Sequence, residues 1–147
     1  MNRKELVART SDAMSQLFPE IIRGVQLEFI GKENITNSQF IVLMAVFSER
    51  NPSMGRLASM LGVSMPTVTG IVGRLVARRL IERIADADDR RKIFVSLTRK
   101  GVGVVETFKG IARHRWTEML KVLENEEIEK FYQVVRSMSS KIGSRKG

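Results

Sequence analysis

The chain has 147 residues, about the length of one domain, and its 43% hydrophobic and 28% charged composition is typical of a globular protein. It contains no cysteine, which excludes disulfides, thiolate metal sites and thiol redox switches. No apolar run reaches the roughly 18 residues needed to cross a bilayer, and the N-terminus lacks an apolar signal core, so we expect a cytoplasmic protein that is neither secreted nor membrane-spanning.

The net charge of +9 is concentrated in the middle of the sequence. Residues 1–50 carry six basic and six acidic residues, residues 51–100 carry ten and four, and residues 101–147 carry nine and six. A solvated face that keeps the protein soluble is the simplest explanation of most charged stretches. Concentration of positive charge in one segment favours instead a surface that faces nucleic-acid phosphates.

The first third of the sequence predicts two helices. Apolar residues recur three or four positions apart between residues 6 and 29, which is helical spacing. Pro19 predicts a kink or a break just before it, because proline removes a backbone donor and crowds the preceding turn. Thr36 and Gln39 form a capping-box pattern, so we expect a second helix from about residue 37 to residue 49.

Two further helices follow, each preceded by a serine that can cap it. Ser53 is expected to begin a short helix that ends at Gly62. Ser64 is expected to begin a helix over residues 64–79, with Pro66 tolerated in its first turn.

The remaining sequence predicts two strands and two long helices. Residues 80–84 and 92–97 are rich in β-branched and large apolar residues and are separated by a polar turn, the pattern of a β-hairpin. Helical spacing returns over residues 105–123 and again over residues 125–142. The basic tail after Gly143 is expected to fray.

The apolar stripes of the first and last helices need to be covered. The basic middle of the chain is too small to cover both, so we expect them to pack on each other and on a second copy of the chain. An ordinary core within one chain is the simpler explanation for about half of these residues.

The segment from Ser64 to Gly101 carries the clearest indication of function. It predicts a helix that ends in basic residues beside a two-stranded ribbon with cations at its tip. A helix fits the major groove of DNA, and an arginine-bearing loop can reach the neighbouring minor groove. The pattern therefore predicts a DNA-binding regulator.

Within this segment, the run from Asp86 to Gly101 resembles the wing signature of the MarR family (multiple antibiotic resistance regulators). In that signature an acidic residue, a variable position and an arginine precede a strand that ends in Leu-Thr before a glycine. Residues 57–58, 61–64 and 67–69 resemble the family's helix-turn-helix, and the order of elements agrees as well, so the resemblance covers nearly the whole chain. It implies a mainly α fold with a small β-hairpin wing, in the order of four helices, two strands and two helices.

The resemblance also implies how a single MarR-like domain over residues 1–147 is organised. Residues 36–100 would form a winged helix-turn-helix DNA-binding lobe, and residues 1–35 and 101–145 would supply dimerisation helices. Such a homodimer would bind double-stranded promoter DNA at a palindromic operator. It would act as a repressor without a cofactor, released by a small, aromatic or anionic effector.

The expected DNA-binding residues have physical reasons for their roles. The N-terminal end of a recognition helix enters the groove first, and its free amides favour a phosphate. A guanidinium in a narrow minor groove gains from the enhanced negative potential there. Asp89 is expected to hold Arg91, or another arginine, by a charge-assisted hydrogen bond, because a carboxylate facing a phosphate would be repelled. The residues expected at DNA are Ser64, Met65, Thr67, Val68, Thr69 and Arg74 on the helix and Arg90, Arg91 and Lys92 in the wing.

Three features depart from the family pattern. Gly70 and Gly73 lie inside the recognition helix, and each costs about 1 kcal/mol of helix propensity relative to alanine. Gly70 stands where a longer polar side chain is common, which predicts either poorer direct readout of bases or close backbone packing. Arg79 stands where a helix-ending glycine is common, which predicts a positive φ or a different helix end. Met65 at the helix tip would contact a thymine methyl or pack locally.

Other classes of function have less support. Asp86, Asp88 and Asp89 are followed at once by three basic residues that neutralise them, so we expect no metal site. One histidine, His114, and no cysteine leave no recognisable activated nucleophile, so we do not expect an enzyme. His114 and Trp116 would belong to the core or dimer, or line an effector pocket whose residues the sequence leaves unknown. A winged-helix module that binds protein remains open. It would expose an apolar face on helix 64–79 and resist added salt, whereas DNA binding weakens steeply with salt.

Overall fold

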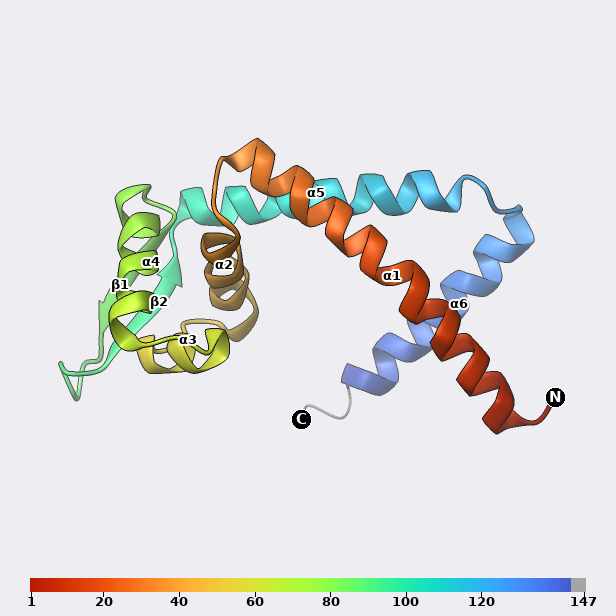
Figure 1. The fold of residues 1–147 in the computed structure, drawn as a ribbon, viewed down its shortest axis with the longest axis horizontal. Coiled ribbons are helices and arrows are strands. Elements are labelled where there is room, and N and C mark those ends of the chain that lie inside the picture. The colour runs from red at the N-terminus through yellow and green to blue at the C-terminus, as the bar shows by residue number, and fades with distance from the viewer. Residues whose placement is uncertain (144–147) are drawn as a thin grey trace. The chain divides into compact units, whose positions relative to one another are not determined.

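The computed structural model describes residues 1–143, and the basic tail after Gly143, expected to fray, lies outside them. Over these residues the chain forms four helices, a two-stranded antiparallel sheet and two more helices (Figure 1). This order confirms the predicted fold class. The elements are α1 (Arg3–Glu33), α2 (Asn37–Glu49), α3 (Met54–Leu61), α4 (Met65–Ala77), β1 (Ile81–Ala85), β2 (Ile93–Leu97), α5 (Arg99–Leu120) and α6 (Asn125–Gly143).

The chain divides into two compact units, and the division falls inside α5, between Ile111 and Ala112. The first unit contains α1 to α4, the hairpin and the start of α5, and the second contains the rest of α5 and α6. The lobe and dimerisation ranges expected from the sequence concern an assembly of two chains and stay a prediction.

The first helix runs without interruption through Pro19. Of the kink or break predicted just before Pro19, the break is therefore wrong. Proline removes one helical hydrogen bond, and the many turns on either side continue the helix. Asn34 ends α1 in the left-handed conformation, with φ of 51°, and its amide donates to the carbonyl oxygen of Ile30.

Side chains cap α2, α3 and α4 as the sequence predicts. The Thr36 hydroxyl accepts from the Gln39 amide at 3.2 Å, and the Gln39 side chain accepts from the Thr36 amide at 2.9 Å. This completes the capping box, and α2 has the predicted bounds. Ser53 caps α3 and Ser64 caps α4, each accepting the amide N–H three residues further on.

The fourth helix ends at Ala77, two residues earlier than predicted, with Arg78 as its C-cap. Arg79 then takes a φ of 59°, in the left-handed region. The positive φ anticipated for Arg79 is confirmed, and a non-glycine residue makes the turn that glycine usually makes.

The core of the first unit lies between α2, α3, α4 and the hairpin. Phe29 of α1 is also fully buried, and its ring meets those of Phe40 and Phe108 edge-on, with centroids 5.6 and 5.4 Å away. These aromatic contacts, with a third between Phe40 and Phe108, join α1 and α5 to α2. The other fully enclosed side chains are Val42, Leu43, Leu57, Val68, Val72, Leu75, Leu80, Ile81, Val95 and Val105.

Two helices keep rows of large apolar side chains exposed in the single chain. Within α1, burial is confined to Val25 and Phe29 near its C-terminal end, and no residue of α6 that the structure describes is buried. The share of these stripes that a core within one chain covers stays a prediction. The exposed residues are Leu6, Val7, Met14, Leu17, Ile22 and Leu27 on α1 and Phe131, Tyr132, Val134, Val135, Met138 and Ile142 on α6.

Among the described residues, no single helix is long and apolar enough to cross a membrane. The helices α3 and α4 reach that length and composition only as a pair, and the pair is bent by 108°.

Candidate nucleic-acid interface

The N-terminal end of α4 presents hydroxyl groups to solvent. Ser64 Oγ lies 2.8 Å from Thr67 Oγ1 and accepts from the Thr67 amide at 3.3 Å. Thr67 and Thr69 are exposed, and Met65 is 48% exposed. Arg74, two turns further along, is exposed as well. Hydroxyls and free amides at a helix N-terminus can donate to phosphate or to base edges.

Val68 does not belong to this exposed group. Its side chain is 0% exposed and lies in the lobe core, so its inclusion among the DNA-binding residues is wrong. The physical reason is helical phase: Val68 precedes Ile71, Val72 and Leu75 by three, four and seven positions, and these residues form the buried stripe of α4.

The turn at the tip of the wing is built by a carboxylate. Asp86 Oδ1 accepts from the amides of Asp88 at 2.8 Å and Asp89 at 3.0 Å. These two hydrogen bonds, that from Asp89 first, lower the pKa of the Asp86 carboxyl below its ordinary value. The Asp89 carbonyl also accepts from the Lys92 amide at 2.9 Å. The turn is therefore shaped by hydrogen bonds within residues 86–92, two of which the Asp86 carboxylate accepts.

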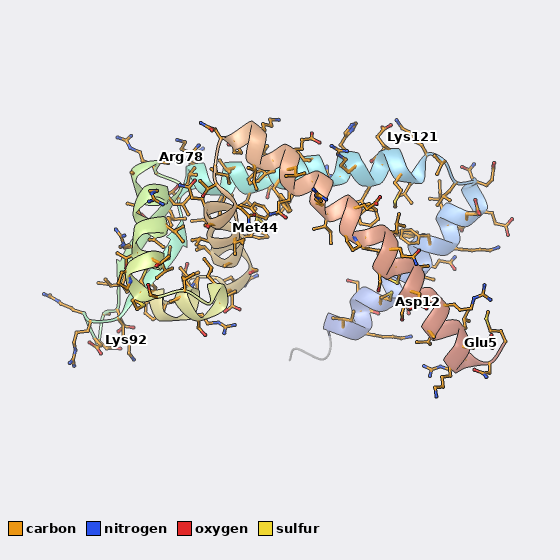
Figure 2. The ribbon with its side chains drawn as sticks, viewed as in Figure 1. Glu5, Asp12, Met44, Arg78, Lys92 and Lys121 are labelled. Carbon is orange, nitrogen blue, oxygen red and sulfur yellow. The ribbon has the colours of Figure 1, made fainter. Side chains whose placement is uncertain are left out.

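Asp89 holds the arginine expected at DNA. Its Oδ1 accepts from Arg91 twice, from the amide at 3.0 Å and from Nε at 3.3 Å. The Arg91 side chain is still 93% exposed, so its guanidinium extends away from the protein. Arg90 and Lys92 are exposed beside it, and Figure 2 shows Lys92 at the far end of the hairpin. The wing tip therefore offers three cations to a partner.

A groove of about 380 Å³ separates the wing from the helices. Its lining includes Met65 and Thr69 of α4, Gly55 of α3, and Arg91 and Lys92 of the wing. Four of the predicted residues thus meet at one groove, and the others do not line it: Ser64, Thr67, Val68, Arg74 and Arg90.

Arg83 is a groove residue that sequence reasoning missed. It lies on β1, and its Nη2 donates to the Thr69 carbonyl at 3.5 Å. Alternate residues of a strand share a side, so Arg83 shares the side of Ile81, which is 1% exposed and buried in the lobe. That alternation was the available signal, and it places a further cation beside α4.

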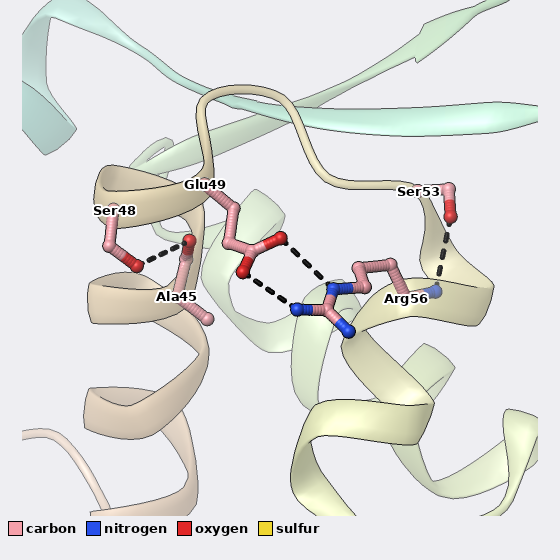
Figure 3. Close-up of polar contacts among 5 residues, drawn as sticks. All are labelled: Ala45, Ser48, Glu49, Ser53 and Arg56. Atoms are coloured by element: carbon pink, nitrogen blue, oxygen red, sulfur yellow. Dashed lines mark hydrogen bonds and ion pairs between the residues drawn. The ribbon is translucent and has the colours of Figure 1, made fainter. Parts of the chain in front are cut away.

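The start of α3 is fixed on both sides. The Pro52 carbonyl accepts from the Val95 amide of β2 at 2.9 Å, which ties the segment before α3 to the hairpin. Figure 3 shows the second tie, in which Arg56 donates to Glu49 from Nε at 3.0 Å and Nη2 at 2.8 Å. The hydrogen bond from Arg56 to Glu49 raises the pKa of Arg56, and the two side chains form an ion pair. Arg56 therefore serves to join α2 to α3.

Gly70 has open space around it. A Cβ built there meets nothing within 4 Å, so the close-packing explanation for this glycine is wrong within the described chain. A Cβ at Gly73 would lie 3.7 Å from Arg83 Nη2, which is ordinary contact. Gly70 thus leaves a gap on the exposed side of α4.

The residues considered for a metal site or an effector pocket do not form a site with the groove. Over residues 1–143, no three His, Asp or Glu side chains gather in a way that could hold a metal ion. His114 is exposed and Trp116 is partly exposed on α5, and neither is among the residues lining the groove.

The chain is similar to known transcriptional regulators. Residues 33–92 match the sequence profile described as MarR family. The chain is 35% identical over 79 residues to the HTH-type transcriptional repressor NicR of Pseudomonas putida, a match that covers 54% of this chain and only half of NicR. It is 30% identical over 105 residues to the transcriptional regulator HosA of Escherichia coli O127:H6, covering 71% of this chain and 78% of HosA. The S. aureus MepR–DNA complex superposes with a TM-score of 0.65 at 26% identity, covering 87% of this chain and 98% of MepR.

Proposed function

The chain belongs to the MarR family of transcriptional regulators, and on that premise we propose that it is a homodimeric repressor that binds a palindromic operator. The helix α4 enters the major groove, the wing reaches the neighbouring minor groove, and a small aromatic or anionic effector releases the protein. DNA as the partner is supported by the MepR–DNA complex, and repression by the likeness to NicR.

The observation that carries the DNA-binding role is the pairing of exposed groups across the groove. Met65 and Thr69 of α4 line one side, and Arg91, which is 93% exposed, lines the other. The exposed hydroxyls of Ser64 and Thr67 lie at the same end of α4, outside the groove lining. In this arrangement α4 positions Ser64, Met65, Thr67, Thr69 and Arg74 at base edges and phosphates, and Arg90, Arg91 and Lys92 enter the minor groove. Asp89 orients Arg91 and does not touch DNA.

The homodimer is supported by the apolar side chains that the single chain leaves exposed on α1 and α6. A second copy is the partner that buries both rows at once and generates a twofold axis. Two winged lobes would then meet half-sites about one helical turn apart, which requires an inverted repeat. Release by an effector is supported by family membership alone.

A protein-binding module is disfavoured by the surface of α4. Among the large apolar side chains of this helix, only Met65 is exposed, and Thr67, Thr69 and Arg74 surround it with polar groups. An apolar docking face of the kind that such a module needs is therefore missing from α4.

The test is selection of bound duplexes from a randomised library, followed by titration of the selected duplex at rising salt. We expect an inverted repeat, a dimer by sedimentation, and an affinity that falls steeply with salt as counterions are released. A protein that remains monomeric and binds no duplex at low ionic strength would contradict the proposed function. Binding that is insensitive to salt would favour the protein-binding alternative.

A further inference from the structure

One side chain fastens the C-terminal end of α4 to the C-terminal end of α1. Arg78 donates from Nη1 to the Asn34 carbonyl at 2.9 Å and from Nη2 to the Glu33 carbonyl at 2.7 Å. These oxygens belong to the end of α1, where no further helical turn supplies amide donors. The contact spans 44 and 45 positions in the sequence, so it is a tertiary link between two helices.

The chemistry of this link suits arginine. Glu33 and Asn34 lie at the negative end of the α1 dipole, which favours a cation. A guanidinium keeps its charge at all working pH values and offers donors in a rigid planar fork, so it can bind both carbonyls at once. Arg78 is partly buried, which reduces competition from water.

The same end of α4 is held on a second side by the start of α5. The Leu80 carbonyl accepts from the Thr98 amide at 3.1 Å, and the Arg78 carbonyl accepts from Lys100 Nζ at 3.0 Å. The backbone of Gly101 lies so close to Leu80 that a Cβ there would be 1.9 Å from the Leu80 carbonyl oxygen. The end of α4, where Figure 2 labels Arg78, is thus held by hydrogen bonds from both sides, and Arg78 is its link to α1.

On the basis of the proposed function, we propose that Arg78 is a positioning residue for operator binding. It does not touch DNA. It fixes the direction of the recognition helix relative to α1, which carries one of the apolar rows assigned to the dimer. The 13 residues of α4 span about 20 Å, so a tilt of about 10° at Arg78 displaces the other end by about 3 Å, close to one base-pair step. Arg78 therefore sets the spacing at which two recognition helices meet two half-sites.

The experiment uses three duplexes and the full-length protein. The first duplex is the inverted repeat that the wild-type protein selects from a randomised library, the second has one base pair added between its half-sites, and the third has a single half-site. The variant is Arg78→Ala. The matched control is Arg79→Gly, which removes the same charge from the next residue and preserves the left-handed φ.

We expect Arg78→Ala to bind the selected repeat about tenfold more weakly, within the usual range for coupling between sites. Its preference for the selected repeat over the lengthened one should fall, because the two lobes are no longer held at one spacing. Its affinity for the single half-site should change no more than that of Arg79→Gly, and the control should keep the wild-type spacing preference. Sedimentation and thermal unfolding check that the variants remain folded dimers.

A wild-type spacing preference in Arg78→Ala overturns the assignment, and so does an equal loss on all three duplexes, which indicates local damage to α4. Arg78→Lys keeps the charge but not the planar fork, so we expect a reduced spacing preference there too. If Arg78→Ala does not fold, a wild-type preference in Arg78→Lys overturns the assignment by itself. Failure of the proposed function looks different, because the wild-type protein then selects no inverted repeat.

Discussion

Replacing Arg91 with alanine separates DNA binding from folding. The Arg91 side chain is 93% exposed and its ion pair with Asp89 lies at the surface. Exposed pairs of this kind contribute about 0–1 kcal/mol, so the variant should unfold at nearly the wild-type temperature. The effect on operator binding should be much larger, because the wing tip has little structural role to lose.

The size of that effect follows from the proposed dimer. A side chain that makes a specific DNA contact contributes about 1–3 kcal/mol, and a twofold-symmetric complex uses Arg91 twice. The loss for the dimer is then about 2–6 kcal/mol, or a weakening of roughly 30-fold or more. The slope of log affinity against log salt should also become shallower, by about one unit for each lost phosphate contact.

Fluorescence anisotropy with the selected inverted repeat at several salt concentrations measures both quantities. The matched control is Lys121→Ala, which removes one charge from another exposed ion pair, Lys121–Glu118, outside the proposed DNA-binding residues. If Arg91→Ala binds as tightly as Lys121→Ala, the assignment of the wing arginine is refuted. A monomeric or unfolded Arg91→Ala would refute the claim that the wing tip is structurally dispensable.

Three further predictions concern stability at fixed protein concentration. Gly101→Ala should destabilise the fold by about 1–3 kcal/mol in thermal unfolding, because the added Cβ would lie 1.9 Å from the Leu80 carbonyl oxygen and α5 would have to move. An unchanged melting temperature would contradict this close approach. Gly70→Ala should instead stabilise the fold by about 1 kcal/mol and raise the melting temperature by a few degrees, since the added Cβ has nothing within 4 Å and alanine is the better helix former. A lower melting temperature would contradict the open space at Gly70. Asp86 has a lowered pKa in the folded state, so its carboxylate stabilises the fold at pH values above the ordinary pKa of 3.8, and this stabilisation is lost as the pH falls through the folded pKa. Asp86→Asn should lose part of this dependence of stability on acid pH. Identical pH profiles of thermal unfolding for variant and wild type would exclude the Asp86 carboxylate as the source.

The helix starts could be predicted because capping is local chemistry. Thr36, Ser53 and Ser64 each accept an amide three residues further on, so the residue and its partner lie within one short stretch of sequence. The continuity of α1 through Pro19 could not be predicted, because a proline defect is weighed against the turns on both sides. The burial of Val68 was readable from its spacing to the apolar residues of α4, but its place near the helix tip favoured a DNA role.

Tertiary contacts account for what the sequence did not reveal about the site. Arg83 reaches Thr69 only because the hairpin folds back beside α4, and the alternation along β1 indicates the side of the strand on which Arg83 lies but not its partner. Arg78 finds its partners 44 and 45 positions away, at oxygens of the backbone, which every residue carries. A side chain whose partner is a distant carbonyl leaves no pattern of residue types, so only the folded chain shows it.

In the proposed DNA complex, Asp86 and Asp89 of the wing oppose binding by charge and favour it by geometry, and the magnitudes indicate that geometry prevails. A carboxylate about 7 Å from a phosphate in water repels it by only about 0.6 kcal/mol, and salt reduces this further. Against this, Asp86 organises the turn through two amide hydrogen bonds, and Asp89 restricts Arg91 through its amide and its Nε. A free arginine side chain carries about 2 kcal/mol of rotamer entropy, so restricting even part of it before binding outweighs the repulsion. The acidic residues therefore strengthen a basic wing by fixing where its cations point.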